Sequence, residues 1–275
     1  MESIDKNKKI LMALSAVGLA GAGLYFLVKT LGVSKREEQK EKTLDQQHCE
    51  EILHVNFAKD ANYTAGIENL KIMLKNQSGG TLSKNFLIAI NKAIIQLMKN
   101  EFISTFVMIR NARRSLLTDL EKYAEFVVGS MSETDRILDQ ASAEVFADLG
   151  IDGELVEAES ERIAEEDPQF SVFMLYMIES AKSAIPSKRS KPVILQDVIA
   201  FYEHQIKTLE KSDFTHLNDI DHEMRIQIKQ TYILDRAALD LNIEEEDLMR
   251  NPQLMMANQQ LMQLQNKLQS LLIRA

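Results

Sequence analysis

The chain has 275 residues and a formal net charge of −9, which argues against nucleic acid as its main partner because phosphate backbones bind basic surfaces. Its hydrophobic share of 45% and charged share of 27% are those of a globular protein. Four prolines and ten glycines are few and favour long helices over strands and turns. Cys49 is the only cysteine, which excludes an intramolecular disulfide and is typical of a reducing compartment.

An uncharged, mostly apolar stretch occupies residues 10–28, with lysines on both sides. At 1.5 Å per residue, a helix of this length reaches about 28 Å, close to the thickness of a bilayer's hydrocarbon core. We therefore predict a single N-terminal transmembrane helix. The alternatives are a cleaved signal peptide, since small residues within the stretch suit a peptidase, and a buried core helix.

Small residues within this predicted span have a spacing that lets a second membrane helix approach closely. Ala16 and Ala20 are four residues apart, as are Gly18 and Ala22. We expect this face to take part in helix packing within the membrane. A moderately apolar anchor flanked by lysines, in a chain without a cysteine framework, favours a mitochondrial membrane, with the endoplasmic reticulum as the alternative.

The body that follows the anchor is predicted to be all-α, because no run of alternating strand character occurs. A charged spacer without an apolar face separates it from the membrane. The predicted divisions are a membrane anchor at 1–33, the spacer at 34–47, a helical subdomain at 48–184, a linker at 185–192, a second helical subdomain at 193–250 and a C-terminal interaction helix at 251–275.

The densest apolar pattern covers residues 86–128, where apolar side chains recur at intervals of three and four. Ser83 is a suitable N-cap for this segment. A break near Lys99 and Asn100 would produce a hairpin of two helices, whereas no break would produce one very long helix. We favour the hairpin. Gly129 is expected to end the run before a further helix begins.

Proline marks three further boundaries. Asp167 and Pro168 predict the start of a largely apolar helix, because an N-cap residue is often followed by proline in the first turn. The linker at 185–192 contains two prolines, which lack a backbone donor and end helices. Longer helices are expected over residues 193–212 and 219–241, and Pro252 is expected to start the final helix.

Asp148, Asp152 and Glu159 fall at the first, fifth and twelfth positions of a calcium-binding EF-hand loop. Gly150, at the third position, offers no side-chain oxygen, and no second loop is present to pair with this one. The favoured interpretation is a helix that ends at Gly150 and a new helix capped by Asp152, with no metal and no cofactor. A calcium-responsive regulator that uses the three carboxylates is the alternative.

The final helix carries an apolar seam of the kind that joins helices in coiled coils. Leucines at heptad spacing form it: Leu254, Leu261, Leu264, Leu268 and Leu271. We predict that this seam binds another protein subunit. Docking of the seam on the chain's own core is the alternative.

The sequence contains no phosphate-binding glycine loop, catalytic triad pattern or nucleophile elbow. We therefore expect a non-enzymatic structural or adaptor subunit, anchored in a membrane and belonging to a larger assembly. The expected partners are the lipid bilayer and other protein subunits, reached through the C-terminal helix and the membrane helix, and not nucleic acid. An enzyme whose site is assembled from scattered residues is a third possibility.

Overall fold

A computed structural model describes residues 55–77, 80–250, 252–255 and 258–274. Every regular element within these ranges is a helix, which confirms the predicted all-α class. The predicted anchor at 10–28, with Ala16, Gly18, Ala20 and Ala22, and the predicted spacer at 34–47 lie outside the described residues. No helix in the described part of the chain combines the length and the apolar character needed to cross a bilayer.

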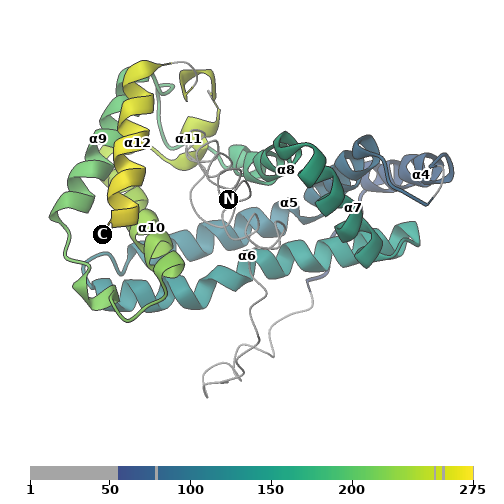
Figure 1. The fold of residues 1–275 in the computed structure, drawn as a ribbon, viewed down its shortest axis with the longest axis horizontal. Helices are drawn as coiled ribbons and strands as arrows, with labels where there is room; N and C mark the ends of the chain where they lie inside the picture. The colour runs from purple at the N-terminus through teal and green to yellow at the C-terminus, as the bar shows by residue number, and fades with distance from the viewer. Residues whose placement is uncertain (1–54, 78–79, 251, 256–257, 275) are drawn as a thin grey trace.

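Two long antiparallel helices run the length of the molecule and form a hairpin (Figure 1). Helix α5 spans Lys84–Arg114 and α6 spans Leu120–Leu149. With 31 residues, α5 is about 46 Å long. Ser83 caps α5 by accepting a hydrogen bond from the backbone N–H of Phe86, as its sequence position predicts.

Both breaks predicted within this segment are wrong. Helix α5 passes through Lys99 and Asn100 without interruption, because its apolar stripe stays on one face, with Met98 and Phe102 buried on either side. Helix α6 likewise continues through Gly129. A glycine inside a helix costs about 1 kcal/mol relative to alanine, and packing along α5 outweighs that cost.

Shorter helices pack on each half of the hairpin (Figure 1). The half that holds the start of α5 carries α4 (Ala61–Lys75), α7 (Gly153–Glu166) and α8 (Pro168–Ser180). The half that holds the hairpin turn carries α9 (Leu195–Lys211), α10 (His222–Leu241) and α12 (Gln259–Arg274). The short elements are η1 (Ala181–Ala184), η2 (Thr215–Leu217), α11 (Glu245–Met249) and η3 (Pro252–Met255).

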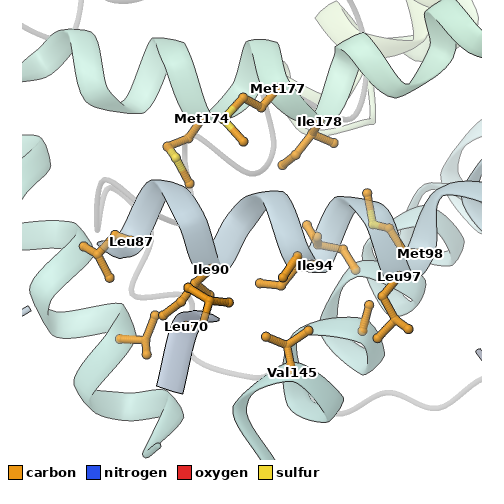
Figure 2. Close-up of a cluster of buried hydrophobic side chains, with 14 of the residues drawn as sticks. Leu70, Leu87, Ile90, Ile94, Leu97, Met98, Val145, Met174, Met177 and Ile178 are labelled. Carbon is orange, nitrogen blue, oxygen red and sulfur yellow. The ribbon is translucent and has the colours of Figure 1, made fainter. Parts of the chain in front are cut away.

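Each half has its own hydrophobic cluster. In the first cluster, α5 lies between α8 on one side and α4 and α6 on the other, as Figure 2 shows. Ile90 and Ile94 of α5 are buried on the side that faces Leu70 of α4 and Val145 of α6, and Met174 of α8 packs on the opposite side of α5. A buried aliphatic side chain contributes roughly 2 kcal/mol, so this cluster stabilises the start of α5.

The second cluster surrounds the turn of the hairpin. It joins Leu117 and Tyr123, beside the turn, to Phe201 of α9, Ile228 of α10 and Leu261 of α12. The first cluster rests on α5 and α6, and the second rests on the hairpin turn and the start of α6, so the hairpin belongs to both halves of the molecule.

Several boundaries follow the sequence closely. Helix α8 begins at Pro168 after Asp167, as predicted, and Asp167 accepts a hydrogen bond from the backbone N–H of Gln169. Helices α9 and α10 match the two longer helices predicted after the linker, which itself contains no helix in the structure. The predicted start of the final helix at Pro252 is wrong, because Pro252 opens η3 and α12 begins at Gln259.

Candidate functional site

Charged side chains gather where α5, η1, α10 and α11 meet, between the two hydrophobic clusters. We call this group the charged junction, and its members are Arg110, Arg113, Arg114, Tyr123, Lys182, Asp235, Glu244, Glu245, Glu246, Asp247 and Arg250. Most of them are buried. A buried charge is costly unless it is paired and hydrogen-bonded, so the pairing within this group decides what it can do.

The arginines of the junction come from one face at the end of α5. Arg110, Arg113 and Arg114 are three and four residues apart, which places their side chains together on one side of a helix. Cations in the last turn of a helix also interact favourably with its dipole. The end of α5 therefore presents a compact positive group to α10 and α11.

Asp235 of α10 is fully buried and accepts hydrogen bonds from three groups. The donors are Arg113 Nε at 2.5 Å, Arg114 Nε at 2.8 Å and the Tyr123 hydroxyl at 2.9 Å. Burial of the Tyr123 phenol, together with the Asp235 charge, raises the phenol's pKa well above its ordinary value. The phenol therefore stays protonated and acts as a donor to Asp235.

Glu244, the N-cap of α11, and Glu246 within α11 contact Arg114 and Arg110. Glu244 accepts two hydrogen bonds from Arg114, both at 2.8 Å, and Glu246 accepts two from Arg110 Nη1, at 2.8 and 3.1 Å. Burial is the largest single effect on Glu244 and opposes its charge, but the hydrogen bond from Arg114 and the charges of Arg114, Arg110 and Lys188 together lower the pKa of this carboxyl. Burial dominates at Glu246 and raises its pKa, although Arg110 acts against that rise.

The junction also reaches η1, which contributes Ala181 to the first cluster. Lys182 Nζ lies 3.3 Å from a Glu245 carboxylate oxygen and 4.6 Å from the centroid of the Phe106 ring. The Arg110 guanidinium lies over the same ring, at 5.2 Å from its centroid. Such cation–π contacts are attractive and gain strength when water is excluded.

Arg250, just after α11, links α11 to the segment that follows η1. Its Nη1 atom donates to Asp247 at 2.6 Å, and its Nη2 atom donates to the backbone carbonyl of Ile185. Helix α11 is therefore tied on one side to α5 and on the other to η1 and the start of the linker. Each acidic side chain of the junction faces an arginine or a lysine. Such pairing can hold the helices of the two halves in a fixed position relative to one another.

The residues of the EF-hand alignment do not form a continuous loop. Helix α6 ends at Gly150, whose φ of +67° is left-handed, and Asp152 caps α7 by accepting a hydrogen bond from the backbone N–H of Glu154. The predicted helix end and the predicted cap are confirmed. Glu159, the twelfth position of the alignment, lies within α7.

The three carboxylates of that alignment have separate partners. Asp148 accepts from Lys59 and from the Tyr63 hydroxyl, each at 2.8 Å. Glu159 accepts from the backbone N–H of Leu82 at 3.2 Å and from Arg162 Nη2 at 2.8 Å. Among the described residues, no group of three or more histidine, cysteine, aspartate or glutamate side chains is arranged to hold a metal ion.

The leucine seam of the final helix faces the chain's own second cluster. Leu261 and Leu268 are buried there, and the other three seam residues, Leu254, Leu264 and Leu271, are partly buried against the same cluster. Leu272, which the sequence interpretation left out of the seam, is buried beside them. In this structure the seam leucines therefore dock on the chain's own core, as the alternative interpretation expects. Binding of the seam to another subunit stays a prediction.

Sequence interpretation missed the charged junction. Its signal is present as two runs of opposite charge, the arginines at 113–114 and the acidic residues at 244–247. No local pattern joins the two runs, since about 130 positions separate Arg114 from Glu244. No protein-family model, curated protein or solved structure matches this chain.

Proposed function

We propose that this protein is a membrane-anchored, non-enzymatic adaptor that acts as a rigid helical spacer within a larger assembly. The charged junction is the observation that supports this proposal most. It joins the helices of the two halves through paired, buried charges, and it leaves no acidic member without a cationic partner. A protein that holds two partners at a set separation needs such a connection.

The long hairpin supplies the separation. A helix of 31 residues extends about 46 Å, and each half of the hairpin carries its own group of helices (Figure 1). Buried ion pairs contribute little net stability but can favour one arrangement over others. In this proposal the junction holds the two groups in one relative orientation, and each group offers a surface to a different partner.

The first half of the molecule offers an acidic surface. Exposed carboxylates follow one another at intervals of three and four along α7, at Glu154, Glu157, Glu161 and Glu165. This row complements a basic protein surface rather than nucleic acid.

The second half offers α12. The leucine seam is occupied within the chain, but Met262 and Ile273 are exposed on a neighbouring side of the same helix. They are eleven residues apart, which is close to three helical turns and places them in one row. Contact with another subunit through α12 would use this row, or would use the leucine seam after α12 leaves the second cluster.

The membrane part of the proposal rests on residues 10–28. The predicted span would hold the body at a bilayer, and its small residues would pair with a second membrane helix. A mitochondrial membrane is favoured and the endoplasmic reticulum is the alternative. The partners are then the lipid bilayer and other protein subunits.

The test is purification of the full chain from its native membrane in a mild detergent, followed by native electrophoresis and subunit identification. We expect the chain to resist carbonate extraction and to migrate with the same partners at fixed stoichiometry. Deletion of residues 10–28 should release the protein from the membrane. A chain that migrates alone in mild detergent, or that carbonate releases, would contradict the proposal.

A further inference from the structure

Two segments of the chain place a serine directly after two basic residues. One is Arg113-Arg114-Ser115, and the other is Lys188-Arg189-Ser190. Protein kinases that select basic substrates bind such cations beside the accepting serine through acidic side chains of their own. The substrate segment must be exposed and free of helical structure to enter a kinase groove, so the structure distinguishes the two candidates.

Ser115 does not meet these conditions. The preceding arginines are held by Asp235 and Glu244, and their side chains are only 10% and 9% exposed. Ser115 itself ends α5, and its hydroxyl donates to the backbone carbonyl of Ala112 at 2.6 Å. A kinase would have to break the ion pairs of Arg113 and Arg114 before it could bind this segment.

Ser190 meets them. It lies in the stretch between η1 and α9, which has no regular structure, and it is exposed. The Lys188 side chain is 65% exposed, and Lys191 is exposed on the other side of the serine. We propose that Ser190 is a phosphorylation site for a protein kinase that selects basic residues.

The reaction is a phosphoryl transfer from ATP. The Ser190 Oγ atom attacks the γ-phosphorus, the bond from that phosphorus to the β,γ-bridging oxygen breaks, and ADP leaves with the electron pair. The hydroxyl proton passes to a base of the kinase. The product is phosphoserine 190, with a charge of about −1.5 to −2 near neutral pH.

The new phosphate competes for Arg189. In the unmodified chain the Arg189 guanidinium donates to Asp197 at 3.0 Å and to the backbone carbonyl of Asn242 at 3.2 Å. These contacts tie the linker to the start of α9 and the end of α10. A phosphate on the adjacent residue is a stronger acceptor for a guanidinium than a backbone carbonyl, so phosphorylation releases the Asn242 contact.

The experiment incubates the purified full chain, in detergent, with ATP and a kinase of basic specificity, and mass spectrometry locates the phosphate. We expect one phosphate on Ser190, and its loss in Ser190→Ala. Ser115→Ala and Ser187→Ala are the matched controls and should accept the phosphate as the unaltered chain does. A folded chain that accepts no phosphate, or that accepts it at another serine instead, overturns the proposal.

Hydrogen exchange tests the effect on Arg189. Phosphorylation should increase exchange severalfold in peptides that cover residues 186–198 and 239–243. Arg189→Ala should produce the same increase without phosphate. Unchanged exchange on phosphorylation of the unaltered chain would overturn the release of the Asn242 contact.

Discussion

At Asp235, a single buried carboxylate balances two guanidinium groups and accepts a phenol hydrogen bond. We predict that Asp235→Asn, which keeps the size and removes the charge, lowers the free energy of unfolding by roughly 3–5 kcal/mol, because it takes the carboxylate partner from the buried Arg113 guanidinium. Urea unfolding measures this loss. Asp240→Asn is the control, since Asp240 is exposed and should change stability by only about 0.5 kcal/mol. Equal losses in the two variants would contradict the role given to Asp235.

Glu244 gives the junction a dependence on pH. Burial is the largest single effect and opposes its charge, but the Arg114 hydrogen bond and the nearby cationic charges together hold the folded-state pKa below the ordinary value of 4.5. A lowered carboxyl pKa contributes stability above the unfolded value, and that contribution is lost as the pH falls through the folded value. Burial raises the pKa of Glu246, so protonation of Glu246 in acid favours the folded state. This effect offsets part of the stability that is lost at Glu244.

We therefore predict that the stabilisation contributed by Glu244 disappears as the pH falls below 4.5. Urea unfolding across this range should show a shallower decline of the unfolding free energy in Glu244→Gln than in the unaltered chain. The two chains should differ most near neutral pH and converge in acid. A constant difference at every pH would show that the substitution acts through packing and not through the charge.

At the scale of single elements, α12 is stabilised by its contact with the second cluster. Leu261 is fully buried, whereas the adjacent Met262 is 53% exposed. We predict that Leu261→Ala lowers the free energy of unfolding by about 2–5 kcal/mol, because it opens a cavity. Met262→Ala should change it by only about 0.5 kcal/mol. If Leu261→Ala were equally mild in urea unfolding, α12 would be loosely docked and its seam open to another subunit.

Helix α6 contains one glycine and ends at another. An added Cβ at Gly129 meets no atom within 4 Å, while Gly150 has a left-handed φ of +67°. We predict that Gly129→Ala raises the free energy of unfolding by roughly 0.5–1 kcal/mol, because alanine favours the helix. Gly150→Ala should lower it by roughly 1–2 kcal/mol, because L side chains avoid that conformation. Thermal unfolding should move the two melting temperatures in opposite directions.

At the scale of the whole molecule, the charged junction should make the two halves one rigid body. Spin labels at Ile72→Cys and Met262→Cys, in a Cys49→Ser background, would report the distance between α4 and α12. Both labelled positions are exposed. We predict a narrow distance distribution, and a broader one when Arg250→Ala and Lys182→Met remove the contacts from α11 to η1 and the linker. A broad distribution in the labelled chain without these changes would contradict the rigid spacer.

The sequence by itself determined the helical class, the cap at Ser83, the start of α8 at Pro168 and the end of α6 at Gly150. These features depend on interactions between residues within a few positions of one another, such as caps, turn glycines and the helical period of apolar side chains. Such interactions can be predicted from the sequence because they join residues that are close together along the chain.

The tertiary structure alone decided the continuity of α5 and α6, the docking of the leucine seam and the charged junction. Gly129 and Asn100 weaken a helix locally, and only packing of one long helix on the other keeps both intact. The contact of Arg114 with Glu244 requires the end of α5 to lie beside the segment that follows α10. The physical reason is that the burial of a charge or a leucine depends on which distant segment covers it.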